Sequence, residues 1–324
     1  MQEPDLEFYT EGIFSGSRRV IAKTITLVES TLPSDRRLAS RIIEQVIPYS
    51  GKSVRFGITG VPGVGKSTFI ENLGLYLAGQ GQKVAVLAVD PTSRRSGGSI
   101  LGDKTRMEQL AAHENTFIRP SPAGDTLGGV AAKTREIMLI CEAAGYDVVM
   151  VETVGVGQSE TRVSTMVDFF LALLIAGAGD ELQGIKRGIL EVADAVAINK
   201  ADGDNRERAE RARKEYETAL HLVMPSSRSW TPPVLTCSSV TDGGTANVWH
   251  TVEEHRRIME DTEEFRQRRR QQALDWMWTM VEDGLKQRLN ENEKVKRKIP
   301  KISEKVEKEV ISPSAAAEEI LSYI

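Results

Sequence analysis

One segment of this 324-residue chain restricts its fold more than any other, the glycine-rich run GVPGVGKST at residues 60–68. It follows a short apolar stretch, VRFGITG, and precedes an amphipathic stretch, STFIENLGLYLAG, so it joins a predicted strand to a predicted helix. The run fits the pattern G-x-x-x-x-G-K-[ST] in the strand–loop–helix context that the pattern requires. Glycines let backbone amides approach phosphate oxygens, and the helix N-terminus adds a partial positive charge. The run therefore predicts a nucleoside-triphosphate site.

The side chains of this loop have separate expected tasks. We expect Lys66 to reach the β- and γ-phosphates, where it is a catalytic residue because it stabilises the charge that develops during transfer. Ser67 is expected to ligate Mg²⁺, and Thr68 to contact the α-phosphate. The predicted nucleotide-binding positions are Gly60, Val61, Pro62, Gly63, Val64, Gly65, Lys66, Ser67 and Thr68.

From residue 54 onward, short apolar runs alternate with longer helical stretches. Near-continuous Val, Ile, Leu and Ala runs are typical of strands buried on both faces, and their alternation with helices indicates right-handed crossovers. The sequence therefore predicts an α/β fold with a mostly parallel central sheet flanked by helices. Ligands of such sheets bind beyond the carboxyl ends of the strands. The predicted strands lie within residues 54–60, 83–91, 115–121, 146–153, 168–176, 194–202 and 232–239.

The segment NKAD at residues 199–202 follows the apolar run AVAI and predicts guanine recognition. Asp202 can accept hydrogen bonds from N1–H and the 2-amino group of guanine, whereas adenine offers an acceptor at N1 and has no 2-amino group. A site built for such bonds rejects the wrong base by ~10⁴-fold or more. We expect Lys200 to lay its alkyl stem over the base and Asn199 to brace the neighbouring loops. Ser238 is expected to bring its loop amides to guanine O6.

Three acidic residues, Asp90, Asp103 and Glu152, are candidate Mg²⁺ ligands beside the loop serine. Hard cations take oxygen ligands, directly or through water. A structural helix cap is the alternative for each acid. Glu152 heads the segment ETVGVGQSE and is also a candidate catalytic residue. In that segment Gly155 is the candidate γ-phosphate sensor, and Gln158 can orient the attacking water.

Composition excludes several classes of protein. The 42 Lys and Arg against 46 Asp and Glu give a net charge of −4, which argues against binding nucleic acid through bulk charge. The most apolar stretch, residues 169–179, is too short to span a membrane. Two cysteines, Cys141 and Cys237, cannot build a disulfide framework or a four-cysteine zinc site. With an acidic N-terminal segment that lacks an apolar core, these features predict a cytoplasmic protein.

The periodicity divides the chain into three expected regions. Residues 1–50 form a helical extension, residues 51–250 the nucleotide-hydrolysing domain, and residues 251–324 a C-terminal helical arm. An amphipathic arm of this length can either wrap its own domain or pair with a second subunit as a dimerisation arm. The arginine run 268–270 is expected to be a solvated helix face. Contact with an acidic partner or a CoA phosphate is the alternative.

The motifs occur in the order seen in one family. The segments ITGVPGVGKST, VLAVDPTS, GGSILGDKTRM, FIRPSP, TLGGVAAKTRE, VETVGVGQSE, GAGDELQGIK and INKAD resemble those of methylmalonyl-CoA-mutase-associated GTPases, the MeaB/ArgK family. This family lies in the signal-recognition-particle and MinD-like (SIMIBI) branch of P-loop proteins. The resemblance implies a homodimeric GTPase that converts GTP to GDP with Mg²⁺. It also implies that the protein gates adenosylcobalamin loading, protection and reactivation of an acyl-CoA mutase.

The segment GAGDELQGIKRG at residues 177–188 resembles an additional switch loop of that family. Lys186 matches the family's partner-coupling lysine, and Asp180 and Gln183 lie in the same segment. Its glycines permit a change of shape with the γ-phosphate. A plain surface connection is the alternative.

Two other functions remain open from the sequence. One is a P-loop ATPase or small-molecule kinase, which the NKAD segment disfavours because it selects guanine. The other is a metallocentre-insertion GTPase, which would call for a His-rich tract or a Cys motif. The four histidines here are scattered, and the two cysteines are far apart in the sequence.

Overall fold

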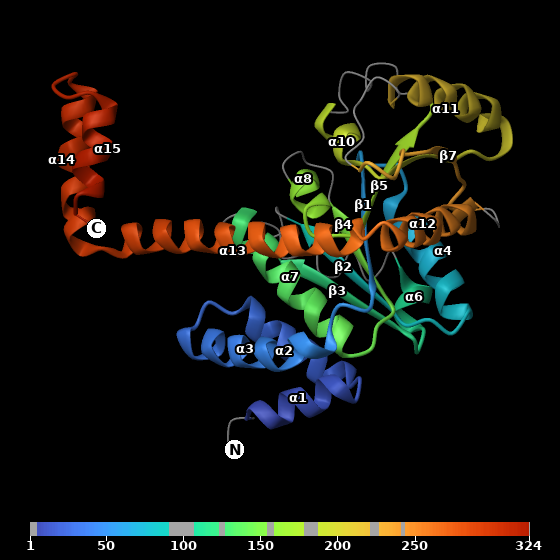
Figure 1. Ribbon diagram of the computed structural model, residues 1–324, viewed down its shortest axis with the longest axis horizontal. Coiled ribbons are helices and arrows are strands. Elements are labelled where there is room, and N and C mark those ends of the chain that lie inside the picture. Colours follow the sequence, from blue (N-terminus) through green and yellow to red (C-terminus); the bar gives the residue numbers. More distant parts are fainter. Residues whose placement is uncertain are drawn as a thin grey trace. The chain divides into compact units, whose positions relative to one another are not determined.

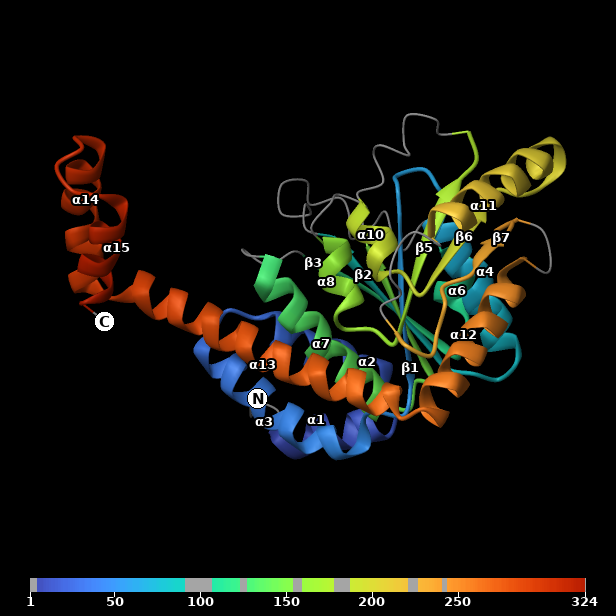
Figure 2. The same cartoon turned by 45° about the horizontal axis from the view of Figure 1, so that its top comes forward.

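The computed structural model divides into two compact units, one up to Gln272 and one from Ala273 onward. The first unit contains a parallel sheet with helices on both faces (Figures 1 and 2). The structure describes residues 5–90, 107–122, 127–153, 159–177, 187–220, 227–240 and 244–323.

The described residues of the first unit form a seven-stranded sheet in the order β3-β2-β4-β1-β5-β6-β7. All neighbouring strands pair in parallel, which confirms the predicted α/β fold. Each strand lies within one of the predicted apolar runs, except that β3 extends one residue beyond its run, to Pro122. Their bounds are β1 Val54–Gly60, β2 Val84–Asp90, β3 Thr116–Pro122, β4 Val148–Thr153, β5 Phe169–Ile175, β6 Ala195–Asn199 and β7 Val234–Thr236.

The helices form a layer on each face of the sheet. Figure 2 shows α4 and α12 on one side of β1, and α2 and α7 on the other. The helices of the first unit are α1 Leu6–Phe14, α2 Arg18–Glu29, α3 Pro33–Val46, α4 Lys66–Gly79, α6 Glu108–Ala112, α7 Leu127–Ala143, α8 Ser159–Ser164, α10 Arg187–Val192, α11 Arg206–Leu220 and α12 Gly244–Asp261, with the 3₁₀ turns η1 Ile47–Tyr49 and η3 Gly203–Asn205. Helix α13, Glu264–Glu291, begins in the first unit and continues into the second.

Strands buried on both faces explain why the apolar runs are continuous. Strands β4 and β6 are buried at every position. Alternate residues of β1 serve opposite layers: Phe56 and Ile58 join the core under α4, while Gly57 faces the other layer. A Cβ at Gly57 would lie 2.8 Å from the ring of Phe170 and 2.9 Å from Val167, so this layer packs directly on the β1 backbone.

The arginine run is not a solvated face, so that expectation was wrong. Arg268 donates to both oxygens of Asp194 at 3.0 and 2.9 Å. Arg269 donates to both oxygens of Asp168 at 2.7 and 2.6 Å, and only Arg270 of the run is exposed. The two aspartates immediately precede β6 and β5 and are buried, so each needs a counter-charge. Consecutive residues of α13 supply it.

The second unit contains the rest of α13 and a hairpin of two helices, α14 Glu293–Glu307 and α15 Pro313–Leu321. Val295 and Ile302 of α14 and Ala316 of α15 are buried. Helix α14 continues through Pro300, which lies inside it. No helix in the described part of the chain is long and apolar enough to cross a membrane.

Candidate functional site

The predicted phosphate-binding loop connects the end of β1 to the start of α4, at the carboxyl edge of the sheet. Gly63 and Gly65 have positive φ angles of 81° and 99°, which L side chains rarely adopt. A Cβ at Gly60 would lie 2.4 Å from the Leu173 carbonyl oxygen, and one at Gly65 would lie 2.8 Å from Asn199 Nδ2. The glycines are therefore required both by backbone conformation and by close approach.

The loop holds its lysine inward. Lys66 is 9% exposed, and its Nζ donates to the carbonyl oxygens of Gly60 at 2.7 Å and Val61 at 3.3 Å. A buried ammonium at the first turn of a helix, where backbone amides also point outward, makes this loop a strongly attractive site for phosphate oxygens.

Ser67 and Glu152 meet beside the loop. Ser67 Oγ donates to Glu152 Oε1 at 3.1 Å, and Glu152 is 8% exposed near the end of β4. The hydroxyl and the carboxylate come from α4 and β4, two elements far apart in the sequence. Both are oxygen donors of the kind that Mg²⁺ prefers, so this pair fits a divalent cation. Asp90 is the last residue of β2, and the register pairs its neighbour Val89 with Thr153, directly after Glu152.

Several predicted site residues lie outside the described parts of the chain, so their roles stay predictions. The side chain of Asp90 belongs to this group although its backbone is described. The others are Asp103, Gly155, Gln158, Asp180, Gln183 and Lys186.

Asn199, the last residue of β6, joins two loops of the site. Its Nδ2 donates to the Val64 carbonyl oxygen at 2.8 Å, and its Oδ1 accepts from Ser239 Oγ at 2.9 Å. Lys200 has a positive φ of 60° and donates from Nζ to the Gly63 carbonyl oxygen at 2.8 Å. The phosphate-binding loop and the segment after β6 are therefore held together by direct hydrogen bonds.

Asp202 is held by the segment after β7. Its Oδ2 accepts from Ser238 Oγ at 2.5 Å, and the preceding amide of Ala201 donates to the Cys237 carbonyl oxygen at 3.0 Å. Ser238 is 4% exposed, whereas Asp202 is partly exposed. Because Ser238 fixes one oxygen of the Asp202 carboxylate and the side chain is still partly exposed, the carboxylate can accept hydrogen bonds from a bound ligand.

Three further residues support this site and were not predicted. Asn72 of α4 donates from Nδ2 to the Ser239 carbonyl oxygen at 3.0 Å, and Ser239 in turn bonds Asn199. A Cβ at Gly244 would lie 2.6 Å from the Ser238 amide nitrogen. For Ser239 a sequence signal existed, because the segment TCSS ends in two serines and the second of them could also have been assigned a polar role at the site. Asn72 has no local signal, because its partner is 167 residues away.

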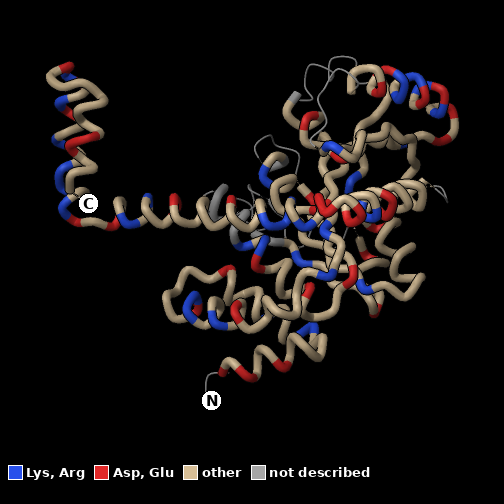
Figure 3. The backbone as a smooth tube through the Cα atoms, in the orientation of Figure 1, with Lys and Arg blue, Asp and Glu red and all other residues tan. Residues whose placement is uncertain are grey.

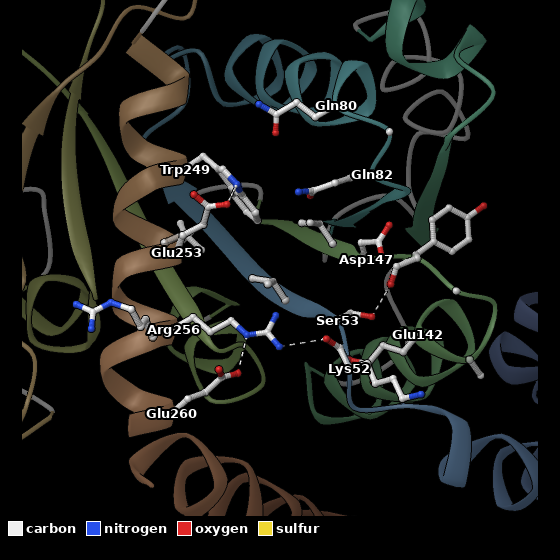
Figure 4. A pocket seen from close by; sticks show the side chains of 18 of the residues that line it. Lys52, Ser53, Gln80, Gln82, Glu142, Asp147, Trp249, Glu253, Arg256 and Glu260 are labelled. Atoms are coloured by element: carbon white, nitrogen blue, oxygen red, sulfur yellow. Dashed lines mark hydrogen bonds and ion pairs between the residues drawn. The ribbon is translucent and has the colours of Figure 1, made fainter. Parts of the chain in front are cut away.

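A hollow of about 790 Å³ lies at the opposite, amino-terminal edge of the sheet, where it reaches Val54 and Val148 (Figure 4). Its polar walls are bonded within the protein: Trp249 Nε1 donates to Glu253 at 2.8 Å, and Arg256 pairs with Glu260 at 2.8 Å. None of the predicted nucleotide-binding residues lines it. The candidate site is therefore the loop cluster at the carboxyl edge.

This cluster can be compared with known proteins. The family model described as methylmalonyl Co-A mutase-associated GTPase MeaB matches residues 21–294. The chain belongs to the MeaB family. It is 50% identical over 318 residues to a putative GTPase of Caulobacter vibrioides, covering 98% of this chain and 97% of that protein. It is 46% identical over 309 residues to the GTPase ArgK of Escherichia coli, covering 95% and 93%.

A solved structure described as an LAO/AO transport system kinase has the same fold. Its TM-score is 0.80 at 39% sequence identity, and the match covers 100% of this chain and 98% of that one. This MeaB-family protein is thus a P-loop GTPase, as the sequence resemblance implied. The described residues contain no group of three or more His, Cys, Asp or Glu side chains that could hold a metal ion.

Proposed function

We propose that this GTPase is a chaperone of an adenosylcobalamin-dependent acyl-CoA mutase. It binds and hydrolyses GTP to gate loading, protection and reactivation of the mutase's cofactor. The observation that carries the proposal is the extent of the family match. A model described as mutase-associated covers residues 21–294, from α2 through the nucleotide site and all of α13 to the start of α14. The resemblance therefore includes the parts beyond the nucleotide site.

Guanine selection rests on the anchored carboxylate. Ser238 bonds one oxygen of Asp202 from behind, so the carboxylate has a fixed position from which to accept from N1–H and the 2-amino group. Adenine would leave that carboxylate facing a lone pair, a mismatch of the kind that costs ~10⁴-fold or more. This argument favours GTP over the ATP that a kinase would use.

Hydrolysis in this proposal uses charge and positioning. Lys66 brings a buried positive charge to the loop where the transferred phosphoryl group develops negative charge. Ser67 and Glu152, together with Asp90 and Asp103, would hold Mg²⁺, and the cation would supply positive charge to neutralise the phosphates of the nucleotide. Gln158 is the candidate to orient the attacking water, and Gly155 the candidate sensor of the γ-phosphate.

The proposed homodimer rests on an exposed apolar face of α13. Five large apolar residues at helical spacing are exposed along it: Leu274 (51%), Met277 (43%), Trp278 (60%), Val281 (43%) and Leu285 (53%). Exposed apolar side chains at intervals of three and four are typical of a helix that pairs with another. A second copy of this chain is the proposed occupant, and residues 251–324 are the proposed dimerisation arm.

The proposed location is the cytoplasm. Cys141 and Cys237 are both free and buried, as in a reducing compartment.

The proposed coupling to the partner runs through residues 177–188. Lys186, with Asp180 and Gln183, is proposed to contact the mutase in one nucleotide state only.

A nucleotide panel with and without partner tests the proposal. Rates of phosphate release from GTP and ATP are measured for the purified chain, alone and with methylmalonyl-CoA mutase from the same genome. We expect slow hydrolysis of GTP that the mutase accelerates, and little hydrolysis of ATP. Equal rates with ATP would favour the kinase or ATPase alternative. A GTP rate that no mutase changes would refute the chaperone role.

A further inference from the structure

Helix α4 contacts the candidate site at two places. Its first residues are Lys66 and Ser67, which belong to the predicted phosphate site. Asn72 follows six residues after Lys66, about 9 Å further along the helix axis. There its Nδ2 donates to the carbonyl oxygen of Ser239 at 3.0 Å, in the segment that follows β7. The helix that begins at the phosphate site therefore also holds the segment that is expected to read the base.

Ser239 is almost completely buried, at 4% exposed, and two hydrogen bonds fix it. Its Oγ donates to Asn199 Oδ1 at 2.9 Å, and its carbonyl oxygen accepts from Asn72. A buried carbonyl oxygen that loses its donor is unfavourable, so without Asn72 this peptide group would move to find another partner. Asn72 thus determines where the backbone at Ser239 lies.

These bonds close a ring around the start of α4. Asn199 Nδ2 donates to the Val64 carbonyl oxygen at 2.8 Å, and Val64 lies in the loop that leads into α4. From Val64 the chain runs along α4 to Asn72, which bonds Ser239, and Ser239 bonds Asn199. The phosphate-binding loop and the segment after β7 are therefore held relative to each other from two sides.

The backbone amide of Ser239 has no hydrogen-bond partner within the described residues. The neighbouring amide of Val240 donates to Ser238 Oγ at 3.2 Å, and the same Oγ donates to Asp202. An N–H fixed one residue away from the serine that holds this carboxylate suits a base with a carbonyl oxygen next to N–H donors. Guanine has this arrangement at O6, N1 and the 2-amino group.

We propose that Asn72 is a positioning residue for the recognition of the guanine 6-carbonyl. It fixes the backbone at Ser239, and the Ser239 amide donates to O6. Asp202, which accepts from N1–H and the 2-amino group, is held by Ser238 instead. This inference rests on the proposed guanine site. It adds that selection of the 6-carbonyl depends on a residue of the phosphate-binding helix.

The contact made by Asn72 is neutral and separate from the packing of α4. The helix packs into the core through apolar residues such as Phe69 and Leu73, both 0% exposed, whereas Asn72 is partly exposed. Helix α4 has two charged residues, Lys66 and Glu71, while α11 is crowded with both signs of charge (Figure 3). Loss of the Asn72 amide should therefore leave α4 folded, and salt should not screen its effect.

The test uses nucleotides that change one edge of the base at a time. 6-Thio-GDP replaces O6 by sulfur, a weaker acceptor, and keeps N1–H and the 2-amino group. IDP keeps O6 and N1–H but lacks the 2-amino group. Diphosphates are chosen because this GTPase does not hydrolyse them. Their dissociation constants relative to that of GDP are measured by displacement of a fluorescent GDP analogue.

Asn72→Leu removes the donor and keeps the approximate size of the side chain, and leucine is a good helix former. Its preference for GDP over 6-thio-GDP should fall about three- to tenfold, the effect of one hydrogen bond. The fall should be the same at about 50 mM and about 300 mM NaCl. The preference for GDP over IDP should stay at the wild-type value. Asn72→Asp, which also lacks the donor, should give the same result. The matched control is Asn247→Leu at an exposed position of α12, which should keep both preferences.

Other results overturn the inference. A preference for GDP over 6-thio-GDP that is absent in wild type, or unchanged in both Asn72 variants, would show that Asn72 does not act on a bond to O6. An equal fall in both preferences would make Asn72 a general support of the site. A wild type that binds GDP and IDP equally would reject Asp202 as the reader of the base, and this inference with it. None of these results bears on the chaperone function, which is tested separately with the mutase.

Discussion

The anchor between α13 and the sheet depends on one buried carboxylate. Asp168 is 5% exposed and precedes β5. Its Oδ1 accepts from Arg269 Nε, while its Oδ2 accepts both from Arg269 Nη2 at 2.6 Å and from the Arg55 amide at 2.8 Å. In Asp168→Asn, an amide NH₂ in the place of Oδ2 would face these two donors. We predict that this substitution strongly destabilises the first unit.

The magnitude follows from the burial of the pair. The side chains of Arg269 and Asp168 are 15% and 6% exposed, so solvent screens little of the lost attraction. Breaking a buried ion pair by removing one charge costs about 3 to 5 kcal/mol. For a unit of this size the expected fall in Tm is roughly 10 °C.

The pH dependence gives a second signature. Burial alone would raise the pKa of Asp168, but the attraction and hydrogen bonds of Arg269, helped by Arg55, hold the pKa below its ordinary value. A carboxyl with a depressed folded pKa contributes its full stability above its unfolded pKa of about 4 and loses it as the pH falls through the folded value. The difference between wild type and Asp168→Asn should therefore be constant from about pH 7 to pH 5 and shrink below about pH 4.

Urea unfolding followed by circular dichroism measures the effect, with Asp261→Asn as the matched control. Asp261 pairs with Arg257 four residues away, and both side chains are 67% exposed. Such surface pairs contribute about 0.5 kcal/mol or less, so the same chemical change should have little effect there. If the two variants unfold at the same urea concentration, the buried anchor does not stabilise the unit and the reasoning from burial is wrong.

Four further predictions concern function. Asp202→Asn should shift nucleotide preference from GTP toward XTP in competition binding, because the amide can donate to the additional carbonyl of xanthine. Lys66→Ala should abolish turnover and weaken triphosphate binding, and an unchanged kcat would remove residues 60–68 from the active site. Lys186→Ala should keep the basal GTPase rate and lower the mutase-stimulated rate, because it removes a contact of the kind that couples two sites by about 1 to 3 kcal/mol; equal stimulation would refute the switch role. Trp278→Ser should shift sedimentation from dimer to monomer, whereas an unchanged dimer would place the interface elsewhere.

The fold was largely predictable because its signals are local. The central strands are buried on both faces, as the apolar run in β5 illustrates, so the run itself marks the strand. The phosphate-binding loop was equally accessible. Its glycines are needed for local backbone conformation, such as the positive φ of Gly63 and Gly65. A short run of consecutive residues is therefore enough to reveal the loop.

The braces of the site and the anchor of α13 were less predictable because they join residues that are far apart in the chain. Asn72 reaches Ser239 across 167 residues, and Arg269 reaches Asp168 across 101. Helical periodicity says that the arginine run shares a helix, but it does not say what that helix packs against. One signal was available nevertheless. Asp168 and Asp194 each stand directly before a strand buried on both faces, where a carboxylate without a counter-charge would be too costly. An aspartate in that position therefore predicts that an arginine elsewhere in the chain supplies its counter-charge. The run at 268–270 holds three consecutive arginines and was the first place to look for one.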